Sequence, residues 1–253
     1  MIKPRVPKTD YSKIAEYYDK VRPESADVLS KIIEHGKIDS RCTILDVGCG
    51  TGRFPLGISA MKNPIICGLE PSIEMLKRAV AKDKSRNILW VLGDGQKLPF
   101  RDGFFDCIYM TLVIHHMENK EMAFREIYRA LKKGGNCVIV TTSHSRIRKH
   151  IIHDFPGASA IDLKRFPSVS SLKRTMIEIG FEDVHYHIVQ HDEGYVPTDE
   201  YLERVKNKYI STLTLLSEEA FQKGLKIFEQ KMRRKYGTQI RRISGFIFVV
   251  GQK

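Results

Sequence analysis

Residues 44–54, ILDVGCGTGRF, constrain the fold of this chain more than any other stretch. An apolar run that ends in an acid is typical of a buried β-strand, and the glycines at 48, 50 and 52 predict a tight turn. Pro55 follows at a position that the first turn of a helix tolerates. A strand, a glycine-rich turn and a helix in this order are the usual arrangement for binding a nucleotide-like cofactor, because backbone N–H groups can approach the ligand closely.

Apolar runs alternate with helical periodicity from residue 43 to residue 141. This spacing predicts βαβ units and a mainly parallel sheet. The clearest helix is the last one, in which Lys132 and Lys133 occupy the final turn and Gly134 ends it. The expected strands are 43–47, 65–70, 88–92, 105–110 and 136–141, and the expected helices lie near 54–61, 72–83 and 119–133.

The regular alternation stops after residue 141. Residues 142–167 have no clean period, so we expect a long connection with one short helix, of the kind that is usually functional or disordered. Ser168 is the predicted N-cap of a helix that ends at Gly180, and residues 183–190 alternate as a strand does.

A second interruption covers residues 193–240. Thr198 and Ser217 are the predicted N-caps of two helices, and Gly237 is the predicted end of the second. The last eleven residues, ISGFIFVVGQK, form a final strand. The sequence therefore predicts one sheet with two insertions in its C-terminal half.

Length and composition favour one domain. A chain of 253 residues with 42% hydrophobic content can bury a full core, so we expect a single α/β domain over 1–253. Residues 1–40 contribute two helices, broken at Pro23, and 41–142 form the cofactor-binding core. The polar N-terminus and the lack of a long apolar run argue against a signal peptide or a membrane span.

The cysteines and the net charge suggest a compartment and a class of partner. Five cysteines occur singly, which predicts reduced core residues in a cytoplasmic protein, with neither disulfides nor a metal site. The formal charge of +12 is compatible with an anionic partner or with an ordinary lysine-rich surface.

Acids follow the first three predicted strands at Asp46, Glu70 and Asp94. Ligands of open α/β sheets bind at the carboxyl ends of the strands, so these acids belong to the candidate site. Glu70 closes the second strand, where a carboxylate can accept both hydroxyls of a ribose. A dinucleotide-binding turn would need glycine at position 53, which is Arg53 here, so a pyrophosphate is disfavoured.

Five motifs in order carry a family resemblance: ILDVGCGTG, GLEPS, GDGQKLPFRDGFFDCIYM, LVIHHM and REIYRALKKGG. Over residues 11–142 the sequence resembles the class I S-adenosylmethionine-dependent methyltransferases, and in particular the subgroup of ubiquinone and menaquinone C-methyltransferases and many small-molecule methyltransferases. The resemblance implies a Rossmann-like, mainly parallel seven-stranded sheet flanked by helices, with an antiparallel C-terminal strand and helical insertions. It also implies S-adenosylmethionine as the cofactor.

The resemblance further implies roles for individual residues. Asp46 would hold the ammonium of the methionine portion and the amides of the glycine turn its carboxylate; Glu70 would bind the ribose, and Asp94 the adenine amino group. Tyr11, Tyr18 and Arg22 match an N-terminal helix that closes over the cofactor. The implied cofactor-binding residues are Tyr11, Tyr18, Arg22, Asp46, Gly48, Gly50, Gly52, Glu70, Pro71, Ser72, Asp94, Gly95 and Thr111.

Methyl transfer from a sulfonium needs alignment more than a covalent nucleophile, so the sequence points to no certain catalytic residue. His115 and His116 follow the fourth strand and are weak candidates for a base, because in the family that the sequence resembles a histidine pair here is more often structural than catalytic. The remaining histidines have no recognised metal-ligand spacing.

The acceptor is expected between the two insertions, 142–167 and 193–240. Their mixed apolar and basic content favours a small molecule over a duplex. The candidate lining residues are Phe155, Phe166, Tyr195 and Tyr201. The alternative acceptor is RNA or a protein, contacted through basic clusters at 146–150 and 231–242. No membrane partner is expected, and a monomer and a homodimer both remain open.

Overall fold

The computed structural model describes residues 26–253. Within them, seven strands form one sheet in the order β3-β2-β1-β4-β5-β7-β6. Strands β1 to β5 are parallel, whereas β7 runs antiparallel to both β5 and β6. The predicted fold class is therefore confirmed. The strands are β1 Thr43–Val47, β2 Ile65–Glu70, β3 Ile88–Leu92, β4 Phe105–Thr111, β5 Leu131–Thr141, β6 Glu182–Pro197 and β7 Gln239–Gln252.

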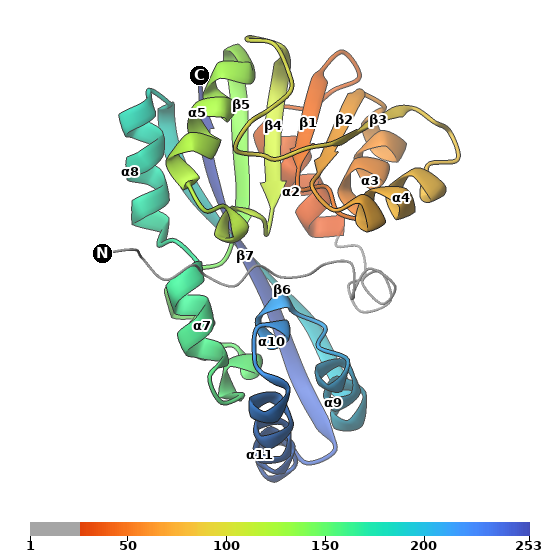
Figure 1. Cartoon of the computed structure of the whole chain (residues 1–253), viewed down its shortest axis with the longest axis vertical. Coiled ribbons are helices and arrows are strands. Elements are labelled where there is room, and N and C mark those ends of the chain that lie inside the picture. Colours follow the sequence, from red (N-terminus) through yellow and green to blue (C-terminus); the bar gives the residue numbers. More distant parts are fainter. Residues whose placement is uncertain (1–25) are drawn as a thin grey trace.

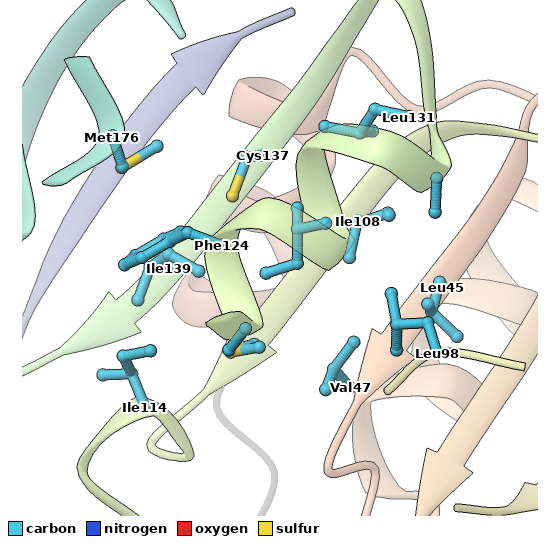
Figure 2. Close-up of a cluster of buried hydrophobic side chains, with 14 of the residues drawn as sticks. Leu45, Val47, Leu98, Ile108, Ile114, Phe124, Leu131, Cys137, Ile139 and Met176 are labelled. Atoms are coloured by element: carbon cyan, nitrogen blue, oxygen red, sulfur yellow. The ribbon is translucent and has the colours of Figure 1, made fainter. Parts of the chain in front are cut away.

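Helices cover both faces of the sheet (Figure 1). Neighbouring strand residues point to opposite faces, so Leu45 joins one core cluster and Ile44 the other. Figure 2 shows the first cluster, in which Phe124 of α5 and Met176 of α8 pack on the sheet. Burial on both faces explains why the strands read as continuous apolar runs. The flanking helices are α2 Ala26–Gly36, α3 Arg53–Lys62, α4 Ile73–Lys82, α5 Lys120–Ala130 and α8 Val169–Ile179.

Two of the predicted N-caps are confirmed and one is wrong. Ser168 accepts a hydrogen bond from the amide of Ser171 at 3.1 Å, and Ser217 accepts one from Ala220 at 3.2 Å. Thr198 is instead the first residue of α9, because the chain enters that helix through Pro197 with no side-chain cap.

The helix that was expected over 119–133 ends early, at Ala130. Leu131 pairs with Phe105 of β4, and Lys132 donates to the carboxylate of Asp106 at 2.8 Å. Lys132 and Lys133 therefore belong to β5 and not to the last helical turn, because strand pairing overrides their good local fit to a helix end.

The first insertion contains more structure than expected. Instead of one short helix, the chain forms α6 His144–Lys149, a 3-10 turn at Ile151–Asp154 and α7 Ala158–Arg165. Each piece is too short to show a sequence period, and side-chain caps start two of them.

The second insertion lies at the end of a two-stranded ribbon. Pairing of β7 with β5 stops at Ile247, whereas pairing of β7 with β6 continues to Gln239. The ribbon extends beyond the sheet and carries α9 Thr198–Lys206, α10 Ser211–Thr214 and α11 Glu218–Tyr236 (Figure 1).

The two insertions share one apolar core. Ile152 and Phe155 of the first insertion pack with Tyr201 and Phe228 of the second. This cluster is separate from the two that flank the sheet. The insertions thus form one cap, which we define as residues 144–165 together with 198–236.

Candidate functional site

The glycine turn after β1 has the shape of a ligand cradle. Gly48, Gly50 and Gly52 have φ values of 77°, 58° and 80°, which other residues adopt only with strain. A Cβ at Gly48 would meet Val113 at 2.5 Å, and one at Gly52 would meet Trp90 at 2.6 Å. A Cβ at Gly50 would meet no described atom within 4 Å. Two of the glycines therefore allow close packing, whereas Gly50 faces open space.

The amides of the three glycines already have acceptors. Gly48 donates to the Leu69 carbonyl at 2.7 Å, and Gly52 donates to the Cys49 carbonyl at 3.0 Å. Gly50 donates to Glu70 Oε2 at 2.9 Å. The expectation that these amides hold a carboxylate is therefore not supported, and the glycines contribute space rather than donors.

Asp46 is a buried carboxyl group at the end of β1. Its Oδ1 has no hydrogen-bond partner among the described residues. Burial raises the pKa of Asp46 well above its usual range, while Tyr109 and Arg53 act in the opposite direction. A buried carboxylate without a partner is costly, so this position suits a ligand that brings a cation or a donor.

Glu70 is held at the end of β2 by two backbone amides. Its Oε2 accepts from Gly50, and its Oε1 accepts from Ser72, each at 2.9 Å. Burial raises the pKa of Glu70 as well. Each carboxylate oxygen can accept more than one hydrogen bond, so both oxygens retain capacity toward a pair of hydroxyls.

The turn after β3 lies beside Glu70. The Gly93 amide donates to the Glu70 carbonyl at 3.1 Å, and exposed Asp94 accepts from the Gln96 amide at 2.9 Å. Gly95 is close to Val47, because a Cβ there would meet that side chain at 2.6 Å.

The remaining predicted cofactor residues divide into two groups. Pro71 is exposed, Ser72 caps α4, and Thr111 ends β4 with no described partner for its buried Oγ1. Tyr11, Tyr18 and Arg22 lie outside the described residues. The described residues of the predicted set all gather at the carboxyl edge of β1 to β4.

A cavity of about 1050 Å³ adjoins this edge. Thr111 and Arg53 lie on its wall, whereas the carboxylates of Asp46, Glu70 and Asp94 do not. The cap and the β6–β7 ribbon form a large part of the wall, and the start of α2 and the segments after β4 and β5 also contribute. The cavity therefore extends from the predicted cofactor edge toward the cap.

Only one of the four side chains that we expected in the acceptor pocket lines this cavity. Phe166 does so, and its ring stacks on His115 with centroids 3.8 Å apart. Phe155 and Tyr201 are buried in the core of the cap, and Tyr195 is 65% exposed outside the cavity. The error has a simple cause, since the cap needs large aromatics to form a core of its own.

His115 and His116 form a 3-10 turn after β4, and both line the cavity. Arg165, buried at the end of α7, lies with Nη2 3.3 Å from His116 Nδ1. A guanidinium can only donate, so His116 Nδ1 accepts and the ring proton sits on Nε2. In this tautomer His116 offers the cavity a donor rather than a base.

Arg165 belongs to a buried polar cluster that the sequence did not point to. Asp162 accepts from Thr212 at 2.7 Å, lies 2.9 Å from His153 Nε2 and pairs with Arg165 at 3.5 Å. Ser211 accepts from Arg165 at 3.2 Å. This cluster joins both insertions, and no local pattern could have indicated it because its hydrogen bonds connect residues up to 50 positions apart.

A family model described as a methyltransferase domain matches residues 45–139. The ubiquinone/menaquinone biosynthesis C-methyltransferase of Geotalea daltonii is 27% identical over 69% of this chain and 90% of its own length. The malonyl-[acyl-carrier protein] O-methyltransferase of Legionella pneumophila is 35% identical over 52% of this chain, which spans about half (48%) of that protein. Residues 45–139 therefore form a methyltransferase domain, of the class I S-adenosylmethionine-dependent kind.

The fold of this methyltransferase matches solved structures as well. A crystal structure from Anabaena variabilis ATCC 29413, described as a candidate methyltransferase of an antibiotic biosynthesis pathway, superposes with a TM-score of 0.73. It is 21% identical and covers 93% of this chain and 100% of its own.

Residues 26–253 contain neither a candidate membrane-spanning helix nor a candidate metal site. No helix there is long and apolar enough to cross a membrane. No group of three or more His, Cys, Asp or Glu side chains there is placed to hold a metal ion.

Proposed function

We propose that the methyltransferase binds S-adenosylmethionine at the carboxyl edge of β1 to β4 and transfers its methyl group to a small molecule held beneath the cap. The observation that carries this proposal is the cavity of about 1050 Å³, which begins at Thr111 and Arg53 and is bordered by both insertions. Partly apolar cavities of this order suit small molecules.

The residues at the edge fit the cofactor. The unsatisfied Oδ1 of Asp46 suits an ammonium group, and Glu70 has the geometry to accept two ribose hydroxyls. The open space at Gly50 leaves room for the methionine portion. Arg53 is close enough to Asp46 to lower the pKa of that carboxyl, and its charge suits a ligand carboxylate.

S-adenosylmethionine would supply an electrophilic methyl group. The protein's own part is to orient the acceptor in line with the methyl group and the sulfur, to exclude water and to bind charged groups of the ligands. Phe166 and His115 give the cavity a flat aromatic wall, and His116 gives it a donor. No described residue acts as an evident base, so we assign none, and an acceptor that is already nucleophilic fits this site best.

The structure of the second basic cluster weighs against RNA as the acceptor. Its cations mostly face carboxylates of the same chain, which leaves little free charge for phosphates. The pairs are Lys231 and Lys235 with Asp154, Arg233 with Asp199 and Glu229, Arg241 with Asp192, and Arg242 with Glu193. A small-molecule acceptor is therefore the better supported reading, in line with the names of the relatives.

Three further assignments extend this proposal. The single domain over 1–253 includes the cap as its acceptor-binding part. The five cysteines are free thiols, which supports a reducing, cytoplasmic location. A monomer or a homodimer remains the prediction for the oligomeric state.

Calorimetry with S-adenosylmethionine tests the cofactor site. We expect Glu70→Gln to weaken binding about tenfold or more, since a hydrogen bond to a charged group contributes about 1.5–3 kcal/mol. Exposed Glu74 at the start of α4 offers the matched control Glu74→Gln, which should bind as the natural protein does. Absence of binding to the natural protein would refute the proposal.

A second experiment identifies the class of acceptor. The protein is incubated with methyl-labelled cofactor and a cell lysate, which is then separated into metabolites, RNA and protein. We expect the label in the metabolite fraction. Label found only in RNA or only in protein would favour the alternative acceptors.

A further inference from the structure

The cavity wall holds a guanidinium group that has no ionic partner among residues 26–253. Arg146 of α6 lines the cavity and is partly buried, and no side-chain hydrogen bond or ion pair of Arg146 occurs among the described residues. Two other arginines of the wall are paired. Arg242 pairs with Glu193 at 2.9 Å, and Arg204 pairs with Glu200 at 2.6 Å.

The backbone of β7 fixes the position of this guanidinium. Gly245 pairs with Gln190 of β6 and also lines the cavity. A Cβ at Gly245 would overlap Cζ and both terminal nitrogens of Arg146. The planar guanidinium therefore lies directly against Gly245, in a position that is accessible only because residue 245 has no side chain.

We propose that the methyl acceptor carries an oxyanion, a carboxylate or a phosphate, and that Arg146, seated on Gly245, binds it. This inference rests on the proposed function of the same cavity.

Three observations support this assignment. An unpaired cation that is partly out of water is costly, and burial lowers the pKa of Arg146 accordingly. An oxyanion would offset that cost, and the fork of a guanidinium matches a carboxylate or a phosphate in two parallel hydrogen bonds. His116 lines the same cavity.

The chemistry of the reaction agrees with such an anchor. Since no base is assigned among the described residues, we expect alignment of the acceptor to supply most of the rate. A two-point hydrogen-bonded anchor remote from the reacting atom supplies that alignment.

A surface for RNA would look different. Arg148 lies on the same short helix as Arg146, but it is exposed and does not line the cavity. The phosphates of RNA would bind exposed Arg148 at least as well as Arg146, which lies in the cavity wall. Arg148 is therefore the natural control.

Fragment binding tests the inference in the full-length protein saturated with S-adenosylhomocysteine. Benzoate and phenyl phosphate are the probes, and benzamide and benzyl alcohol are their uncharged counterparts. We expect both anions to bind at least about tenfold more tightly than the uncharged pair, because a charge-assisted bidentate hydrogen bond is gained. The stronger anion identifies the class of oxyanion.

Three variants locate the anion. Arg146→Met should remove the preference for anions, and Gly245→Ala should weaken anion binding about tenfold by displacing the guanidinium while keeping its charge. Arg148→Met should leave binding unchanged. Thermal unfolding of all three variants confirms that each is folded.

The results separate this inference from the proposed function. If S-adenosylhomocysteine binds but the anions show no preference, or if Arg146→Met leaves that preference intact, the oxyanion inference is wrong and the cofactor site stands. If Arg148→Met weakens anion binding as much as Arg146→Met does, the anions bind to the general positive charge of the surface and not to Arg146 in the cavity. The inference then fails. If S-adenosylhomocysteine itself does not bind, the proposed function fails.

Discussion

Gly50 and Gly103 have almost the same backbone conformation in very different places. Their φ values are 58° and 61°, and a Cβ on either would meet no described atom within 4 Å. Gly50 lies in the turn that follows β1, whereas Gly103 lies in the loop before β4. Alanine substitutions at these two glycines can therefore distinguish the conformational cost of a side chain from its effect on ligand binding.

Alanine at either glycine should cost about 1–2 kcal/mol of unfolding free energy, because both residues are in the left-handed region. Only Gly50→Ala should also weaken S-adenosylmethionine binding, on the order of tenfold, since its methyl group would enter the space that we assign to the cofactor. Chemical denaturation gives the first quantity and calorimetry the second. Equal cofactor affinity in the two variants would show that Gly50 does not face the ligand.

At the scale of the element, α11 illustrates how the cap is held together. Gly224 lies where this helix crosses Phe155, and a Cβ there would meet the ring at 2.6 and 2.9 Å. The same ring packs against Phe221 and Phe228, with centroids 5.6 and 5.5 Å away. The ring therefore has no room to move aside.

Gly224→Ala should destabilise the protein by about 1–2 kcal/mol. In an exposed helix this change would stabilise by about 1 kcal/mol, but overpacking in a filled core costs about 1–3 kcal/mol and outweighs the gain in helix propensity. Urea denaturation measures the effect, and Lys223→Ala, on an exposed neighbour, should stay within about 0.5 kcal/mol of the natural protein. Stabilisation by Gly224→Ala would mean that the cap is loosely packed.

At the scale of the whole molecule, the junction between sheet, ribbon and cap partly buries His150. Its Nδ1 accepts from the Ile152 amide at 3.3 Å. Burial is the main cause that lowers the pKa of His150 to about 4, with His153, Arg242 and Arg146 adding to the shift and Asp162 opposing it.

This histidine predicts a loss of stability in mild acid. Below about pH 6.5 the unfolded chain protonates His150, whereas the folded chain does so only near pH 4, so unfolding takes up a proton and stability falls as the pH is lowered between these values. The full effect is about 3 kcal/mol at most, at about 1.4 kcal/mol per unit of pKa.

The variant His150→Asn keeps an acceptor for the Ile152 amide and removes the titration. Relative to it, the natural protein should lose about 2–3 kcal/mol of unfolding free energy between pH 7.5 and pH 4.5. Urea denaturation across this range provides the measurement. Parallel pH profiles for the two proteins would rule out His150 as the cause.

The sequence by itself determined the sheet and the edge on which the cofactor is expected to bind. Strands β1, β2 and β3 were predicted at their observed bounds, because the runs that form them are apolar and each is bounded by turn residues. The acids Asp46 and Glu70 were identifiable because parallel strands bring their carboxyl ends to one edge. Both signals are local in the sequence, so they can be recognised without knowledge of the fold.

Only the tertiary structure decided what surrounds the acceptor. The insertions share a core, Arg146 lies against Gly245 about 100 residues further along the chain, and Arg165 reaches back to His116. These contacts depend on the path of the chain through space and leave no period or spacing in the sequence. For the same reason the aromatic residues that were expected in the pocket proved to be the core of the cap, since composition cannot tell which side of a helix faces a cavity.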